Sequence, residues 1–184
     1  MKRQLFFRGI TEIVGSEEMG LIVLTDEYMT RQLVIVCDKQ TVYQFGLRMS
    51  RSGGDTKDLL PEVLASIIKR DINLDYHIDI EDIDNGKYKT VIHEVVFDHK
   101  NTIRASDAIL LSYICKLKIF IDETLYLHQS VPYNDQAKGM SIPINAISDD
   151  MLQKALDRAI KDENYELASQ ISIEQKKRRN KATM

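Results

Sequence analysis

Hydrophobic and polar residues alternate in three early segments of the chain, and each segment has the length of a strand. The segments cover residues 4–14, 20–26 and 31–37 and are rich in Val, Ile, Leu, Phe and Thr. The short connections GSEEM and EYMT separate them, which predicts an antiparallel meander. Residues 38–49 follow with Val42, Phe45 and Met49 at helical spacing, and this stretch predicts a helix.

The next part of the chain repeats this order. Residues 57–71 predict an amphipathic helix with a broad apolar face and with Asp58 as its N-cap. Three further strand segments are predicted, over residues 73–80, 87–97 and 100–104. Asn85-Gly86 is the predicted hairpin turn between the first two. A helix and a short strand are predicted next, over residues 105–116 and 118–121. Three strands followed by a helix therefore occur twice, which predicts an α+β fold of duplicated β3α-type units in one compact domain.

The pattern changes after this domain. Residues 129–147 contain two of the three prolines and no strong periodicity, and we interpret this stretch as a linker. Beyond it, apolar residues recur at helical spacing in two stretches separated by KDEN, and Ser148 is placed to cap the first. This predicts a C-terminal helical hairpin of about 30 residues. A unit of that size is too small to be stable alone, so it is expected to dock on another surface.

Composition narrows the class of protein. No apolar run approaches the about 20 residues that span a bilayer, and the N-terminus lacks the apolar core of a signal peptide, so the expected location is cytoplasmic. The formal net charge is −3, which argues against the broad basic surface of a dedicated nucleic-acid binder. Cys37 and Cys115 lie in apolar contexts, and we expect both to be buried, reduced thiols.

Three charged stretches are candidates for chemistry, and each has an ordinary structural alternative. Arg104 and Asp107 precede an apolar helix, where they are either helix-end electrostatics or a phosphate and Mg²⁺ site. The stretch HIDIE places His77, Asp79 and Glu81 on one strand face, as metal ligands or as a solvent-facing surface. The tail EQKKRRNKATM is either a solvated helix end or a site that attracts phosphates.

The order of these landmarks resembles the bifunctional nuclease (BFN) domain family. The resemblance covers about residues 5–133 and depends on TKDLL (56–60), DIDNGKY (82–88) and, most specifically, RASDAILLS (104–112). Residues 148–178 resemble the helical hairpin of the Uvr excision-repair proteins, through LDRAIKDENYELASQI. The resulting domain boundaries are 1–133 for the nuclease-like domain, 134–147 for the linker and 148–180 for the hairpin.

The resemblance implies a nuclease that hydrolyses phosphodiester bonds of DNA and RNA with the help of Mg²⁺ or Mn²⁺. By position it assigns catalysis to Asp58, Arg104 and Asp107, with Ser106 in support, and the metal to Asp58 and Asp107. It also implies a protein partner for the hairpin and a homo-oligomer. Lys57 and Gln40 stand where the family often has His and Glu, which leaves a second hypothesis open: a non-catalytic oligomeric protein-interaction module.

Overall fold

A computed structural model describes residues 1–12, 19–50, 55–70, 75–133 and 144–182 of the chain. The chain forms two compact units. The first consists of Met1–Asp82 and Tyr88–Met140, and the second of Ile83–Lys87 and Ser141–Met184. The architecture is a mixed α+β fold with a C-terminal pair of helices, as the hydrophobic pattern predicts.

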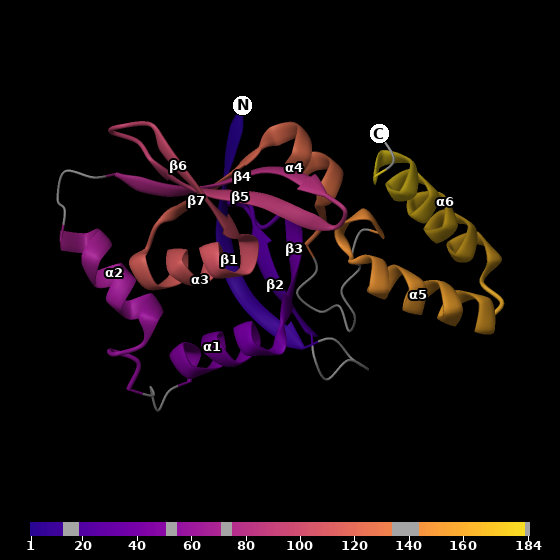
Figure 1. Ribbon diagram of the computed structural model, residues 1–184, viewed down its shortest axis with the longest axis horizontal. Helices are drawn as coiled ribbons and strands as arrows, with labels where there is room; N and C mark the ends of the chain where they lie inside the picture. Colours follow the sequence, from indigo (N-terminus) through magenta and orange to yellow (C-terminus); the bar gives the residue numbers. More distant parts are fainter. Residues whose placement is uncertain (13–18, 51–54, 71–74, 134–143, 183–184) are drawn as a thin grey trace. The chain divides into compact units, whose positions relative to one another are not determined.

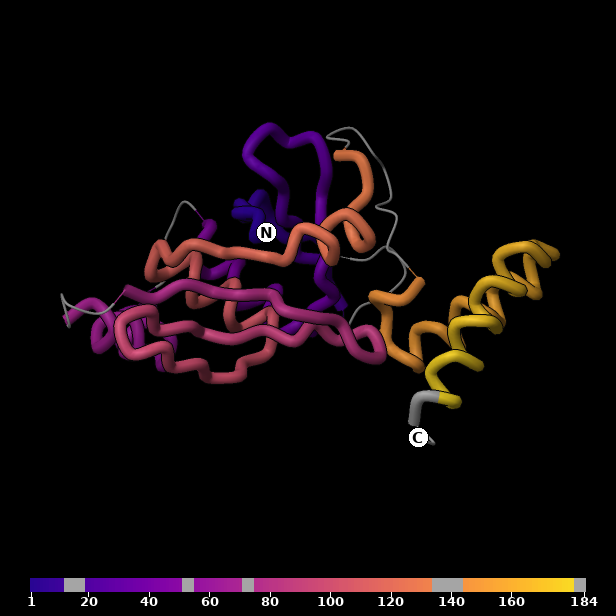
Figure 2. The backbone as a smooth tube through the Cα atoms, turned by 90° about the horizontal axis from the view of Figure 1, so that it is seen from above, coloured from indigo at the N-terminus to yellow at the C-terminus, as the bar shows by residue number. Residues whose placement is uncertain are grey.

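Within the described residues, eight strands form one sheet in the order β6-β5-β4-β7-β1-β2-β3-β8. Their bounds are β1 Lys2–Glu12, β2 Met19–Thr25, β3 Arg31–Asp38, β4 Tyr76–Asp84, β5 Lys87–Glu94, β6 His99–Arg104, β7 Lys118–Asp122 and β8 Val131–Pro132. The strand β7 lies between two three-stranded meanders and pairs antiparallel with β1 and parallel with β4. Figure 2 shows β4, β5, β6 and β7 running side by side. The two predicted meanders thus become the two halves of one sheet.

The described part of the first unit contains four helices: α1 Lys39–Met49, α2 Leu60–Arg70, α3 Ala105–Cys115 and α4 Glu123–Gln129. Figure 1 shows α1, α2 and α3 grouped on one side of the sheet, with α4 apart from them. The order of three strands and a helix occurs twice, as β1-β2-β3-α1 and β4-β5-β6-α3. The core between sheet and helices is mainly aliphatic, with Phe45 as an aromatic member, and includes the fully buried residues Ile22, Leu24, Leu33, Ile78, Ile80 and Ile109.

The helix α3 confirms the interpretation of its sequence as a buried helix. Eight of its eleven residues are buried, and it ends at Lys116 in the left-handed conformation, with φ 62°. The predicted hairpin turn is also confirmed, because Asn85 and Gly86 both have positive φ, 49° and 77°. A two-residue loop with positive φ at both positions matches the twist of the strands it joins.

Three details differ from the prediction. The apolar face of α2 is mostly exposed, because only Ala65 and Ile68 pack against α3 residues such as Leu111. Residues 123–129 form α4, a helix too short to show periodicity in the sequence. Val131 and Pro132 lie within the expected linker but pair with β3 as the edge strand β8. Of the remaining linker, residues 134–143 lie outside the described residues, and Ile144–Ala146 form a 3₁₀ helix.

The second unit contains the predicted hairpin, formed by α5 Asp149–Lys161 and α6 Tyr165–Ala182. Ser148 caps α5 by accepting a hydrogen bond from the Met151 amide at 3.4 Å, as expected. The basic tail is not wholly a solvated helix end, because Arg178 is only 7% exposed. Its guanidinium donates to the carbonyl oxygens of Ile147 and Asn145 and to the carboxylate of Asp149.

No described helix is both long and apolar enough to cross a membrane.

Candidate functional site

Arg104 and Asp107 lie together where β6 ends and α3 begins. Arg104 has extended backbone angles, φ −60° and ψ 139°, and occupies the N-cap position of α3. Its Nε and Nη2 atoms donate to the two carboxylate oxygens of Asp107, at 2.7 and 2.9 Å. This two-pronged geometry fixes the plane of the guanidinium. Arg104 and the first-turn acid Asp107 therefore form a direct ion pair.

A third charged residue, Asp38, completes this site, and the sequence reasoning missed it. Arg104 Nη1 donates to Asp38 Oδ2 at 3.0 Å, while Asp38 Oδ1 accepts from the Thr41 amide at 2.7 Å and so caps α1. Asp38 ends β3 and precedes α1, as Arg104 ends β6 and precedes α3. The two β3α units therefore meet through equivalent positions. The available signal was Asp38 as the first residue of the predicted helix, three residues ahead of Thr41.

The electrostatics of this Arg104 cluster (Asp38, Arg104 and Asp107) favour the charged forms of Asp38 and Arg104. Burial raises the pKa of Asp38, but the hydrogen bonds from Thr41 and Arg104 outweigh it and hold that pKa below its usual value. The hydrogen bond to Asp107 and the charge of that carboxylate raise the pKa of Arg104, and Asp38 adds to the effect. The side chain of Arg104 is 64% exposed.

Arg104 retains binding capacity after these contacts. A guanidinium has five N–H groups, and three of them are used within the cluster. The other two have no partner in the described part of the chain. An exposed, oriented guanidinium with free donors at a helix N-terminus is suited to a phosphate group.

The other predicted site residues lie elsewhere. Asp58 is in the turn before α2, and within the described residues no hydrogen bond or ion pair joins it to Arg104 or Asp107. Leu59, not Asp58, supplies the first helical carbonyl, which accepts from the Val63 amide at 3.0 Å. Ser106 is buried in the first turn of α3, at 7% exposure.

A metal ion at Asp58 and Asp107 fits these positions poorly. Both carboxylate oxygens of Asp107 already accept hydrogen bonds from Arg104, and Asp58 does not share a ligand cluster with it among the described residues. We therefore derive no catalytic step through an ion at this pair.

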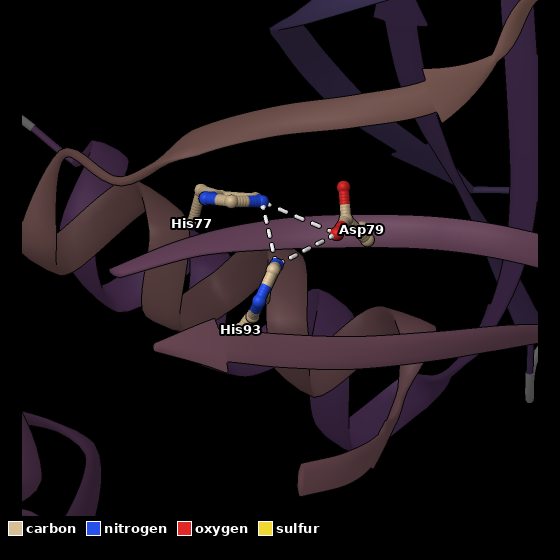
Figure 3. A group of neighbouring side chains, drawn as sticks. All are labelled: His77, Asp79 and His93. Carbon is tan, nitrogen blue, oxygen red and sulfur yellow. Dashed lines mark hydrogen bonds and ion pairs between the residues drawn. The ribbon is translucent and has the colours of Figure 1, made fainter. Parts of the chain in front are cut away.

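A second cluster lies on β4 and β5, on the sheet face away from α3, because Ile92, the neighbour of His93, packs against α3. His77 and Asp79 on β4 meet His93 on β5 (Figure 3), and their ligand atoms all lie within 4.8 Å of one another. Glu81, the third residue of the expected strand face, instead pairs with Lys100 at 2.7 Å. The sequence thus identified two members of this His–Asp cluster (His77, Asp79 and His93). It could not identify the third, because strand pairing brings His93 into place.

The two cysteines are buried free thiols, as expected. Burial raises the pKa of Cys37 to about 12, with a smaller effect from Asp38, and burial also raises the pKa of Cys115. A nucleophilic or metal-binding cysteine needs its thiolate form near neutral pH. Both residues are therefore structural.

No family model matches the chain, and no curated protein matches its sequence.

Proposed function

We propose that the first unit binds and hydrolyses phosphodiester bonds of DNA or RNA, as a BFN-like nuclease, at the Arg104 cluster. The observation that carries the proposal is an exposed Arg104 whose orientation is fixed by two carboxylates and whose other two N–H groups have no partner among the described residues. The resemblance to the BFN family in RASDAILLS supports the same position.

In this proposal Arg104 holds a phosphate through its two free donors, and the carboxylates fix the guanidinium in place. In the same proposal Asp107 is the general base that accepts a proton from the attacking water. Two carboxylates surround one guanidinium, so the cluster alone repels a polyanion. A divalent cation brought with the substrate would offset this charge, in keeping with the Mg²⁺ or Mn²⁺ dependence that the resemblance implies.

The test is a cleavage assay with the full chain. Single-stranded DNA and RNA of one sequence, labelled at the 5′ end, are incubated with Mg²⁺, with Mn²⁺ or with a chelator. The variants are Asp107→Asn, Asp38→Asn and Asp58→Asn. Asp122→Asn is the matched control, because Asp122 caps α4 through the Thr124 amide at 2.9 Å but lies outside the cluster.

We expect Asp107→Asn to lower the cleavage rate by about 10²-fold or more, since proton transfer in catalysis contributes at least that much. Asp122→Asn is expected to cleave like the wild type. The effect of Asp58→Asn shows whether that residue takes part, as the resemblance implies. Cleavage that is equal in wild type and Asp107→Asn, or absent under every condition, would contradict the proposal.

A second candidate is a non-catalytic oligomeric interaction module, and exposed apolar side chains favour it. On α2 the side chains of Leu60, Val63, Leu64 and Ile67 are between 41 and 70% exposed. The hairpin exposes Ile160, Tyr165 and Ile173 by more than half. Under this candidate α2 contributes to a homo-oligomer, and residues 148–180 bind a protein partner. An oligomer detected by light scattering, together with no cleavage in the assay above, would select this candidate.

We also infer that the protein works in the cytoplasm. Its two free cysteines support this location, because an oxidising compartment favours disulfides.

A further inference from the structure

The His–Asp cluster places three ligand atoms in a nearly equilateral triangle (Figure 3). His77 Nε2 lies 3.2 Å from Asp79 Oδ2 and 3.2 Å from His93 Nδ1, and His93 Nδ1 lies 3.4 Å from Asp79 Oδ2. The side chains are 16, 2 and 15% exposed, for His77, Asp79 and His93 in that order. The three atoms are thus close together and largely shielded from water.

We propose that this cluster is a binding site for a first-row divalent transition metal, with Zn²⁺ as the reference ion. In a tetrahedral zinc site, nitrogen and oxygen ligands lie about 2.0–2.2 Å from the ion, which separates them from one another by about 3.3–3.5 Å. The observed separations of 3.2–3.4 Å match this with little movement. Two imidazoles and one carboxylate also suit these ions better than Mg²⁺ or Ca²⁺.

Asp98 orients His93 for such a role. His93 Nε2 lies 2.7 Å from Asp98 Oδ1. A carboxylate only accepts hydrogen bonds, so Nε2 must carry the proton, and in neutral His93 the lone pair is then on Nδ1. That lone pair faces the Oδ2 atom of Asp79. A carboxylate that orients a metal-binding histidine through its other nitrogen is a common outer-shell feature of metal sites.

The converging lone pairs need a positive group between them. His77 Nε2 lies 3.2 Å from both His93 Nδ1 and Asp79 Oδ2. Without a metal, a single proton on His77 Nε2 can be shared between these two acceptors. A divalent ion satisfies all three atoms at once. The ring of Phe120 packs edge-on against His77, with centroids 5.2 Å apart, and limits its rotation. The ligands are therefore held in position before an ion binds.

Lys2 is the competitor for the ion. Its Nζ atom lies 2.7 Å from Asp79 Oδ2, and burial raises the pKa of Asp79 while Lys2 and His77 lower it to below its usual value. The Lys2 side chain is 51% exposed, so it can leave the carboxylate for solvent when a metal takes its place. Asp79 Oδ1 is buried without a hydrogen-bond partner among the described residues. Any positive group that balances the charge of Asp79, whether Lys2 or a metal ion, therefore binds at Oδ2.

Three protein ligands leave a fourth coordination position for a water molecule or a substrate oxygen, as in hydrolytic zinc sites. The site shares no residue with the Arg104 cluster, so the proposal does not depend on nuclease activity.

The test measures metal binding by the full chain, prepared with a chelator and then dialysed. Zn²⁺ affinity is measured by isothermal titration calorimetry, and the ligand type by the visible spectrum of bound Co²⁺. The variants are His93→Ala and Asp98→Ala, with His99→Ala and His128→Ala as matched controls, because those two histidines are exposed and outside the cluster. Lys2→Met removes the competing ammonium.

We expect one Zn²⁺ per chain and a Co²⁺ spectrum of a four-coordinate site without thiolate. Asp98→Ala should weaken binding by about 10–100-fold, the usual effect of losing an outer-shell partner, and His93→Ala should weaken it further. Lys2→Met should tighten binding, a gain that misfolding cannot produce. The proposal is overturned if Zn²⁺ does not bind, or if His93→Ala and His99→Ala weaken binding equally. It is equally overturned if Lys2→Met leaves the affinity unchanged.

Discussion

Buried charged residues in the first unit are held by partners far away in the sequence. Arg48 is bound by Glu62, fourteen residues away, and Asp79 by Lys2, seventy-seven residues away. The sequence could predict that Arg104 and Asp107 lie close together, because helix geometry brings residues three apart to one face. It could not predict that Asp38 contacts Arg104, or that His93 contacts Asp79, because tertiary pairing alone determines those contacts.

Asp26 gives a prediction about pH. Its side chain is 4% exposed, and it accepts a hydrogen bond from the Thr30 amide at 2.7 Å. Burial raises the pKa of Asp26, but the hydrogen bonds from Thr30 and Arg31 outweigh it, so the pKa lies below its usual value. A carboxylate with a lowered pKa in the folded state stabilises the fold above the unfolded pKa of about 3.9. That stabilisation is lost as the pH falls from there through the folded pKa.

We therefore expect Asp26→Asn to lower the free energy of unfolding at pH 7 by about 1–3 kcal/mol, the usual effect of disrupting a buried hydrogen-bonded group. Urea denaturation at pH 7 and at pH 3 should show a smaller acid-induced loss in Asp26→Asn than in the wild type. The exposed neighbour Glu27 supplies the control, Glu27→Gln. An equal acid-induced loss in the wild type and in Asp26→Asn would show that Asp26 does not contribute in this way.

At the scale of elements, long periodic segments could be predicted and short ones could not. The strands β1, β2 and β3 and the helix α3 follow directly from alternation or from a continuous apolar run. The helix α4 and the strand β8 are too short to produce a period. The apolar face of α2 could also be predicted from the sequence. That most of this face stays exposed could not, because burial depends on which other elements of the fold pack against the helix.

Two glycines in neighbouring elements should respond in opposite ways to alanine. A Cβ atom on Gly20 of β2 would lie 2.3 Å from Val42 Cγ2 on α1 and 3.0 Å from the Thr11 carbonyl oxygen on β1. We expect Gly20→Ala to destabilise the protein by about 1–3 kcal/mol through overpacking. Gly46 in α1 has no atom within 4 Å of such a Cβ, and Gly46→Ala should stabilise by about 0.5–1 kcal/mol.

Both changes are measured as shifts of the urea midpoint at constant slope. No loss of stability in Gly20→Ala would contradict the close packing of α1 on β2, and a loss in Gly46→Ala would contradict the open space beside Gly46.

At the scale of the whole molecule, the second unit has its own organising residue. Arg178 on α6 donates to Asp149 on α5, at 2.8 Å, and to Glu174 within its own helix, at 2.9 Å. It also donates to the carbonyl oxygens of Ile147 and Asn145 in the segment before α5. The sequence placed this arginine in a solvated basic run, because a run of like charges carries no information about which member is buried.

We expect Arg178→Met to destabilise the hairpin by about 1–3 kcal/mol, because the carbonyl oxygens of Ile147 and Asn145 lose their donor. Hydrogen exchange followed by mass spectrometry should then show faster exchange in α5 and α6 but unchanged exchange in β1–β3. Lys176→Met is the control, since Lys176 is exposed on the same helix. Unchanged exchange in α5 would mean that Arg178 does not hold the two helices together.

The proposed function requires Arg104 to bind a phosphodiester through a guanidinium whose plane is fixed by Asp107 and Asp38. The most direct test is the rate of single-stranded RNA and DNA cleavage by Arg104→Lys, which keeps the positive charge but loses the planar fork. We predict that kcat/KM falls by about 10²-fold, the usual effect of losing one oriented donor to a developing charge. Cleavage by Arg104→Lys at the wild-type rate would contradict it.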